Sequence, residues 1–435
     1  MSESLTINTY LVEKVEFGER TILENRTLII NRADVLKVVL SDPRITGCDL
    51  ELVEPGESTR VTGDKDVVEP RIKVSGSGVV YPGINDREVT AVGTGVTNRL
   101  SGVSVVEISA VKSFNLADKN QSNSIHAKGL FDMSGPGGDA TPYGKLMHIC
   151  LSLEVTKTIG QDDQNWALHA ATLRVSDLLA KTTLDREPDE SEIFDTSNME
   201  EGLPGIVYIP CMNSPEHYAN SLEAYGVAIY GETRQTPPWV LRPTELLDGA
   251  ICGGYSWQMT NNPVVLGLLR KHQAKQCNFL GVVTIRTRWS SQAEKNVTSN
   301  QAANICKLLG ADGALVTWDA GGNDFMEVAR TIQACEKIGV KTVFMTAEED
   351  PRSGGPPLLE PLSEMDAIVS TGMGANMWNE PVPMPSVDRV VGPSTVLITD
   401  GNKEKIEIPV DSYSEISSLQ WKDHYGFGFR TVKEY

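Results

Sequence analysis

Apolar and polar positions alternate in short runs through the first part of the chain. Residues 1–165 are rich in valine, isoleucine and threonine, with glycine and proline at close intervals, as in TLIINR, PRIKVSGSGVVYPGI and GVSVVEISAV. This pattern is typical of strands and turns. One helix is expected at RADVLKVVLSD, and the glycine-rich stretch 130–145 is expected to be a long loop. We therefore predict an N-terminal β-rich domain over 1–165.

The next stretch combines a helical pattern with an acidic segment. Apolar residues at helical spacing in WALHAATLRVSDLLAK predict a helix at about 166–181. Residues 182–205 are acidic and are interrupted by proline and glycine, which is typical of a linker or an exposed loop. We assign 166–204 to a helix and an acidic linker between domains.

From residue 205 strand and helix patterns alternate. Apolar runs begin near 205, 246, 278, 312, 341 and 366, with helical patterns such as NPVVLGLLRKHQ between most of them. This alternation predicts a doubly wound, mostly parallel α/β domain over 205–395, followed by a C-terminal extension over 396–435. Ligands of such sheets bind beyond the carboxyl ends of the strands, so the residues after each strand are the first to inspect.

Three groups of residues follow predicted strands. Gly321, Gly322 and Asn323 lie in TWDAGGND, where glycine lets a ligand approach and the next helix offers N–H groups to an anion, although a plain turn with a helix cap is the alternative. Arg286 ends the third strand and is suited to grip a carboxylate, unless it is a solvated surface charge. Cys252 ends the predicted second strand, either as a small buried apolar residue or as a reactive thiol.

Charge and composition narrow the classes of function. Acidic residues outnumber basic ones by 58 to 39, and the negative field that results would repel phosphate backbones and anionic lipids. We therefore expect neither nucleic acid nor membrane as a partner. The N-terminus lacks the apolar run of a secretion signal, and no stretch is apolar enough for a transmembrane helix. Seven scattered cysteines in mostly apolar contexts indicate a reducing compartment, so a cytoplasmic protein is expected.

Histidine and cysteine spacing gives no metal-binding signature. The chain has no CxxC or HExxH motif, and its six histidines show no ligand spacing, so no metal site is predicted. His148 lies in an apolar run and His169 in a predicted helix. Each is expected to be structural, with a catalytic role as the alternative.

A series of motifs resembles one known family. SDPRITGCDLELVEPGESTRV, FDMSGPGGDATPYGK, RPTELLDGAI and NFLGVVTIRT occur in this order between about residues 35 and 395. They look like the α/β-subunit precursor of component B of glycine, sarcosine and betaine reductases, to which the D-proline reductase precursor is related. The resemblance implies a hetero-oligomer that cleaves a C–N bond of a small amine substrate. It also implies a thiol- or selenol-bearing partner subunit, which attacks the substrate's α-carbon and releases the amine.

The resemblance further implies a cofactor made from the chain itself. In that family a cysteine shortly after the DGA motif attacks the preceding carbonyl, the thioester is cleaved, and the cysteine loses sulfide to become an N-terminal pyruvoyl group. The new ketone can form a Schiff base with an amino substrate. Cys252 is the matching cysteine here. Arg286, Gly321, Gly322 and Asn323 are then the candidates for binding the substrate carboxylate.

The segment around Cys252 departs from the family pattern. Only nine residues, CGGYSWQMT, separate DGAI from NNP, fewer than the family has, and Cys252 follows isoleucine where the family has a polar residue. Two hypotheses follow. The chain is a reductase-like enzyme subunit whose Cys252 becomes pyruvoyl, or it is an unprocessed homologue. The homologue would be a subunit of a heteromeric hydrolase or lyase acting on another C–N bond, or a non-catalytic scaffold for a partner subunit.

Overall fold

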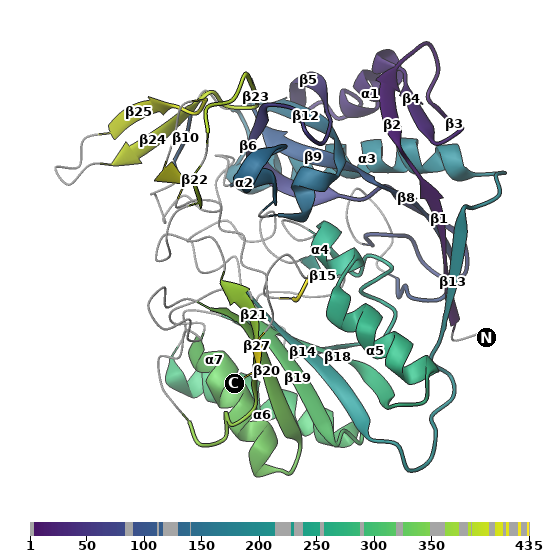
Figure 1. The fold of residues 1–435 in the computed structure, drawn as a ribbon, viewed down its shortest axis with the longest axis vertical. Helices are drawn as coiled ribbons and strands as arrows, with labels where there is room; N and C mark the ends of the chain where they lie inside the picture. Colours follow the sequence, from purple (N-terminus) through teal and green to yellow (C-terminus); the bar gives the residue numbers. More distant parts are fainter. Residues whose placement is uncertain are drawn as a thin grey trace.

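Two layers of structure lie one above the other in Figure 1. The upper layer holds the sheets of the N-terminal half, and the lower layer holds a seven-stranded sheet with helices. The computed structural model describes residues 4–82, 90–110, 113–115, 129–139, 141–213, 228–229, 238–252, 256–287, 291–318, 325–348, 362–373, 382–383, 385–399, 405–411, 415–416, 425–427 and 433–434. Helices and strands occur in both layers, which confirms the prediction of a mixed α/β chain.

The main sheet of the upper layer is mixed, with the strand order β11-β6-β9-β12-β5. Its strands are β5 (Ile45–Val53), β6 (Thr59–Val68), β9 (Val103–Ser109), β11 (Gly129–Asp132) and β12 (Met147–Val155). Helices α1 (Arg32–Val39) and α3 (Gln161–Ala180) contact this sheet, and both were expected from their apolar spacing. Apolar side chains of strands and helices, such as Val105, Leu151 and Ala171, form a fully buried core between them.

A second sheet of the upper layer has the order β13-β1-β8-β7. Its strands are β1 (Ser4–Leu11), β7 (Arg71–Ser75), β8 (Gly95–Ser101) and β13 (Glu190–Asp195). A small sheet of β2 (Lys14–Phe17), β3 (Ile22–Glu24) and β4 (Thr27–Ile30) lies beside α1 in Figure 1. The acidic segment 182–205, which is predicted to be a linker or an exposed loop, thus contains an edge strand. This strand, β13, pairs with β1. Its Phe194 side chain is buried in the core, while the acidic residues of the strand stay in solvent.

The stretch 130–145 differs from the predicted long loop. It contains part of β11, the short helix α2 (Gly135–Asp139) and the 3₁₀ turn η2 (Pro142–Lys145). Thr141 accepts a hydrogen bond from the Tyr143 amide and so caps that turn, and a proline occupies its first position. A Cβ atom at Gly144 would lie 2.2 Å from the Gly138 carbonyl oxygen. The glycines therefore allow close backbone packing rather than an open loop.

The seven-stranded sheet of the lower layer has the order β16-β18-β14-β19-β20-β21-β27. Its strands are β14 (Gly205–Asn213), β16 (Trp239–Leu241), β18 (Asn278–Thr287), β19 (Gly313–Trp318), β20 (Lys341–Glu348), β21 (Ile368–Met373) and β27 (Lys433–Glu434). The five central strands are parallel, and the two edge strands are antiparallel.

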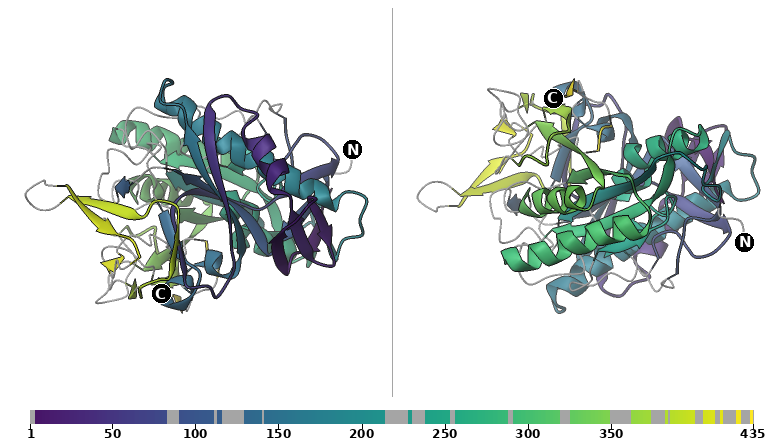
Figure 2. Two further views of the ribbon diagram at one scale, coloured as in Figure 1. Left: turned by 90° about the horizontal axis from the view of Figure 1, so that it is seen from above. Right: turned by 90° about the horizontal axis from the view of Figure 1, so that it is seen from below.

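Helices pack on both faces of this sheet. Tyr208 and Met212 of β14 share one core with α5 (Pro263–Gln273), whereas alternate β14 residues such as Ile209 share another with α6 (Gln292–Leu308) and α7 (Phe325–Lys337). Figure 2 shows α6 and α7 side by side in the view from below. Local sequence sets where the helices start. Asn262 caps α5 just before a proline, and a capping box opens α6.

The strand predicted near residue 246 is wrong. Residues 243–249 form a series of turns, and only Ile251–Cys252 (β17) is extended, paired with β15 (Ala228–Ile229) outside the seven-stranded sheet. Leu246, Leu247 and Ile251 are apolar because they pack in the core shared by α5 and the N-terminal strand β1. Gly249 has φ of +82°, a backbone conformation that a regular strand does not contain.

The C-terminal residues return to both layers. The C-terminal strands are β22 (Val382–Pro383), β23 (Arg389–Val391), β24 (Thr395–Thr399), β25 (Lys405–Pro409) and β26 (Glu415–Ile416). One of their partners is the short strand β10 (Ser113–Asn115). β23 pairs with β6 and β24 with β10, both from the N-terminal half, while β27 joins the lower sheet. The buried Arg60 side chain donates to Asp132 and to the Val410 carbonyl. The predicted boundary at 395 therefore falls within a segment that pairs with the N-terminal half.

A buried ion pair between α6 and α7 gives a first prediction. Lys295 Nζ lies 2.9 Å from Glu327 Oε2, and both side chains are almost fully buried. Glu327→Ala leaves a buried ammonium without this carboxylate, so we expect a loss of about 3–5 kcal/mol in the free energy of unfolding, measured with denaturant. Glu16→Ala, which removes the exposed ion pair with Lys14, should cost less than about 1 kcal/mol. Equal losses in the two variants would contradict this account.

Candidate functional site

The structure describes the frame around the predicted site residues. Cys252 ends β17, with its backbone opposite Ala228, and Arg286 lies in β18 opposite Met212 of β14. The side chains of Cys252 and Arg286 lie outside the described part of the structure, as do Gly321, Gly322 and Asn323 altogether. The chain on either side of Cys252 is held by contacts with the N-terminal half.

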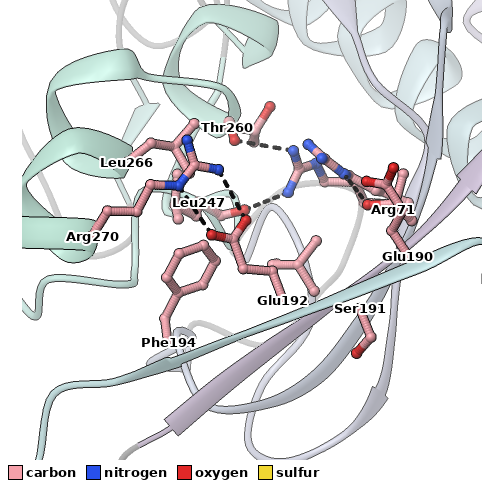
Figure 3. A pocket seen from close by; sticks show the side chains of 12 residues that line it. Arg71, Glu190, Ser191, Glu192, Phe194, Leu247, Thr260, Leu266 and Arg270 are labelled. Atoms are coloured by element: carbon pink, nitrogen blue, oxygen red, sulfur yellow. Dashed lines mark hydrogen bonds and ion pairs between the residues drawn. The ribbon is translucent and has the colours of Figure 1, made fainter. Parts of the chain in front are cut away.

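Arg71 fixes both ends of residues 247–260, which we call the Cys252 segment. This side chain from β7 is 1% exposed. Its Nη1 donates to the Leu247 carbonyl oxygen at 2.6 Å and its Nη2 to the Thr260 carbonyl oxygen at 3.0 Å. Glu69 Oε2 lies 2.5 Å from Nη2 and compensates the buried charge. Figure 3 shows the guanidinium directed at both carbonyl groups, so a single side chain spans the segment.

Asp248 anchors the first part of the segment to the N-terminal half. Its carboxylate is fully buried and accepts hydrogen bonds from the Gly93 amide and the Thr97 hydroxyl, each at 2.6 Å. Lys73 forms an ion pair with the same carboxylate. The aspartate of the DGAI sequence therefore anchors this turn to the N-terminal half.

Helix α4 (Ser256–Thr260), which begins four residues after Cys252, is seated on the upper layer. The Ser256 hydroxyl donates to Asp66 Oδ2 at 2.5 Å, and the Ser256 amide donates to Asp66 Oδ1 at 3.2 Å. Gln258 donates to the Tyr143 hydroxyl at 3.2 Å, and the Trp257 ring meets the Tyr143 ring edge-on with 5.9 Å between centroids. The Cys252 segment is thus tied to the N-terminal half at its start, middle and end.

Asp66 belongs to a group of buried ionisable side chains, which we call the buried cluster: Lys65, Asp66, Glu107 and His169. Each is at most 6% exposed. His169 Nδ1 donates to Glu107 Oε2 at 2.8 Å and lies 3.8 Å from Asp66 Oδ2, and Lys65 donates to Asn165. The pairing of β6 with β9 shifts register between Asp64 and Asp66, so the strand is irregular at Lys65.

Burial shifts the pKa values of two members of this cluster, Asp66 and Lys65, toward neutral pH. It raises the pKa of Asp66 to about 6, although His169 and the Ser256 hydroxyl oppose the rise. It lowers the pKa of Lys65 to about 7 against the attraction of Glu107. The neighbouring Asp64 also has a pKa raised by burial to about 7. Groups that titrate near neutral pH inside a protein are suited to acid–base chemistry.

Sequence reasoning missed most of this cluster. His169 was expected to be structural, and Lys65, Asp66 and Glu107 were not considered, because charged residues in a strand are usually solvent-exposed. The available signal was the run GDKD inside an apolar strand and the lone glutamate in SVVEIS. By contrast, His148 is held by Ser104 and the Tyr143 carbonyl, each at 2.7 Å, and burial lowers its pKa to about 4. These contacts account for it as a structural residue.

A polar pocket of about 280 Å³ lies beside the anchored segment, between β13 and α5 (Figure 3). Leu247 and Thr260, the residues held by Arg71, both line it. Charged side chains of both signs surround it, including Arg270, which pairs with Glu192 at 3.0 Å. Arg71 also lines this pocket, so the side chain that holds the segment forms part of the pocket wall.

The other cysteines with described side chains are poor nucleophiles. Cys150, Cys211, Cys277, Cys306 and Cys335 are buried, and Cys48 is partly buried with its pKa raised by burial to about 12. Within the described residues, no group of three or more histidine, cysteine, aspartate or glutamate side chains is placed to hold a metal ion. Among those same residues, no helix has the length and apolar character needed to cross a membrane.

The raised pKa of Asp66 gives a second prediction. The folded chain binds this proton up to about pH 6, whereas the ordinary carboxyl releases it near 3.8, so ionising Asp66 costs stability as pH rises through this window. Asp66→Asn removes that cost. We expect its free energy of unfolding, relative to the unaltered chain, to increase by about 2 kcal/mol between pH 4 and pH 7.

Denaturant unfolding at both pH values checks this expectation. Asp49→Asn, which alters an exposed carboxylate in β5, is the matched control and should show no such change. A relative stability of Asp66→Asn that is independent of pH would show that the carboxyl titrates normally.

Comparison with known proteins places this chain in a family. The model of the family described as glycine/sarcosine/betaine reductase component B subunits matches residues 3–416. The chain is 32% identical to the betaine reductase complex component B subunit alpha of Peptoclostridium acidaminophilum, covering 91% of this chain and 89% of that protein. No solved structure matches the chain.

Two further relatives carry related names. The glycine reductase complex component B subunits alpha and beta of Acetoanaerobium sticklandii are 30% identical over 89% of this chain and 88% of their own length. The D-proline reductase proprotein of the same organism is 22% identical over 78% of this chain and 53% of its own length. With a family match over nearly the whole sequence, the chain belongs to the component B subunits of glycine, sarcosine and betaine reductases.

Proposed function

We propose that the chain is the component B subunit of a cytoplasmic reductase complex that cleaves a C–N bond of a small amine and releases the amine. The relatives are named for glycine, sarcosine and betaine reductase, which supports a substrate of this size and class. They are components of complexes, which supports a hetero-oligomer with a thiol- or selenol-bearing partner subunit. The observation that carries the proposal is the anchoring of the Cys252 segment on both sides of Cys252.

In this proposal a pyruvoyl group derives from Cys252 after cleavage of the Ile251–Cys252 bond. Arg71 and Asp248 hold the chain before this bond, and Asp66 holds Ser256 after it. A cut would therefore leave both new ends tethered close to where they form. The residues around the site fit such a group, because the buried cluster beside Ser256 offers acid and base side chains. A pyruvoyl group supplies a ketone that reacts with amines and withdraws electrons.

Topology supports the proposed carboxylate site. We interpret the lower sheet as doubly wound, since β14, β18, β19, β20 and β21 lie in the order β18-β14-β19-β20-β21 with helices on both faces. The order reverses between β14 and β19, and ligands of such sheets bind at this point beyond the carboxyl ends. Arg286 is near the carboxyl end of β18, next to β14. Gly321, Gly322 and Asn323 follow β19 in the sequence, and we assign these four residues to the substrate carboxylate.

The first test is cleavage itself. The purified chain should run on a denaturing gel as pieces of 251 and 184 residues, and the smaller one should lack the sulfur and nitrogen of Cys252 by mass spectrometry. Cys252→Ala should give one uncut, inactive chain, because no thiol is left to attack the Ile251 carbonyl. Cys277→Ala, which removes a buried thiol after the same bond, is the matched control and should be cut normally.

An intact chain of full mass in active preparations would show that the pyruvoyl mechanism is wrong. Activity that also survives hydroxylamine, a carbonyl reagent, would then favour the unprocessed homologue acting on another C–N bond. A chain that is intact and has no activity of its own would favour the scaffold.

The second test concerns the cut pieces. β14 belongs to the first piece, yet it lies between β18 and β19 of the second piece and is hydrogen-bonded to both. Separating the pieces would expose two strand edges and both cores of the lower sheet, so they should stay together without a covalent bond. Native mass spectrometry should therefore show the summed mass of the two pieces, with dissociation only under denaturing conditions. Two separate native species would contradict this topology.

A further inference from the structure

We propose that the buried cluster is the proton-transfer centre for cleavage of the chain before Cys252. Asp66 is the member that faces the Cys252 segment, and His169 and Glu107 are positioning residues behind it. This inference rests on the proposed function, because it assigns residues to the step that makes the pyruvoyl group. Neither the motifs around Cys252 nor the names of the relatives point to these side chains.

The chemistry requires protons to move at two points. The Cys252 thiol adds to the Ile251 carbonyl carbon, the C–N bond breaks, and the amide nitrogen gains the thiol proton as a thioester forms. A base then removes the Cα proton of residue 252, the Cβ–S bond breaks, and a thiocarboxylate leaves on residue 251. One water converts the thiocarboxylate to a carboxylate and releases H₂S. A second water converts the remaining enamine, through its imine, to the ketone and releases NH₃. Two waters are consumed in all, and no oxidant or reductant is needed.

The buried cluster is attached to the chain a few residues after this bond. Asp66 binds both the hydroxyl and the amide of Ser256, four residues after Cys252. Four residues span at most about 14 Å even when fully extended, which bounds the distance between the Cα atoms of Cys252 and Ser256. Arg71 and Asp248 restrain the chain before the bond at the same layer. The segment is therefore held between the two anchors with an acid–base group at one of them.

The buried cluster lowers the stability of the fold, so a purely structural role does not explain it. Asp66 and Glu107 are direct partners across β6 and β9, and two buried carboxylates in this position repel each other. His169 lies near both, with its Nδ1–H fixed on Glu107 by a 2.8 Å hydrogen bond. A carboxylate that orients an imidazole beside a second acidic group is the arrangement that proton-transfer sites use. Apolar residues of similar size would stabilise the sheet at least as well.

The charged groups facing Asp66 come from four elements. Asp64 and Lys65 lie beside it in β6, Glu107 faces it from β9 and His169 from α3. The Tyr143 hydroxyl of η2 accepts a hydrogen bond from Gln258 of α4 and is within electrostatic range of Asp64 and Asp66, and burial raises the pKa of Tyr143. With the pKa of Asp66 at about 6, the cluster changes protonation between mildly acidic and neutral pH.

The test follows cleavage of the full chain over time. Newly synthesised protein from cell-free translation is sampled on denaturing gels between pH 5 and pH 8. His169→Gln and Glu107→Gln remove the side chains that orient and polarise Asp66, so they should slow the appearance of the two pieces by up to about a hundredfold, the full effect of an acid–base group. Both should also flatten the pH dependence, which a purely structural role would not alter. Glu107→Asp, which keeps a carboxylate for the imidazole, should recover part of the rate.

His272→Gln is the matched control. His272 is also a buried histidine, at the end of α5, where it accepts a hydrogen bond from the Phe279 amide. This variant should lose comparable stability in thermal unfolding but keep the cleavage rate and its pH profile. Hydroxylamine adds a readout of the blocked step. If elimination is slowed after the acyl shift, hydroxylamine should cut the His169→Gln chain between residues 251 and 252.

The outcomes distinguish the role of the buried cluster from the proposed function itself. Folded His169→Gln and Glu107→Gln chains that cleave at the normal rate and with the normal pH profile would overturn the role of the buried cluster, while the pyruvoyl group would stand. A native chain that is never cut would overturn the proposed function itself. If the variants do not fold, the native chain still decides, because a cleavage rate that is constant from pH 5 to pH 8 would overturn this inference.

Discussion

The hydrogen bonds of Arg71 to two distant carbonyl groups are the constraint on which the central part of the molecule depends. A buried guanidinium needs compensation, and here Glu69 supplies the opposite charge while Leu247 and Thr260 supply oxygen acceptors. The side chain comes from β7 of the N-terminal half, whereas its acceptors belong to the segment that leads from β14 into α5. The Cys252 segment is shaped by this contact rather than by long secondary structure of its own, since its described residues, 247–252 and 256–260, form only turns, β17 and α4.

The same dependence on distant residues recurs in the two layers. Asp248 and Ser256 are held by Thr97 and Asp66 of the N-terminal half, and β23 and β24 return to that half from the far end of the chain. The lower sheet is completed by β27 at the very end of the sequence. The two layers that hold the Cys252 segment are therefore built from residues of all parts of the chain. Loops of this kind, held by rigid sheets, commonly carry function.

Periodicity predicts most of the regular elements of the seven-stranded sheet. The apolar runs at 278, 312 and 341 do form β18, β19 and β20, because buried parallel strands are uniformly apolar. The run at 246 has the same apolar pattern, but its residues form turns. They are apolar because they are buried between the layers, and burial favours apolar residues in turns as well as in strands. The segment at 190–195 reads as a linker because only one of its side chains is fully buried, yet it pairs as an edge strand. Motifs along the whole chain, rather than any single pattern, indicated the family.

Charged residues inside strands are the harder problem for sequence reasoning. Lys65, Asp66 and Glu107 belong to strands whose neighbouring positions are buried, but their partners come from α3 and α4, far away in sequence. No local sequence pattern predicts that His169 contacts Glu107. The packing of α3 on the main upper sheet brings them together, and the Ser256 contact connects them to the Cys252 segment.

The central place of β14 has a consequence for biosynthesis. This strand ends at Asn213, but its neighbour β18 begins at Asn278 and β19 only at Gly313, so the ribosome makes β14 long before either partner exists. Until then both of its edges are open to pairing with other chains. Encoding all three strands in one polypeptide supplies the partners in equal number and at high local concentration. A single reading frame therefore suits this protein even if its mature form consists of two polypeptides.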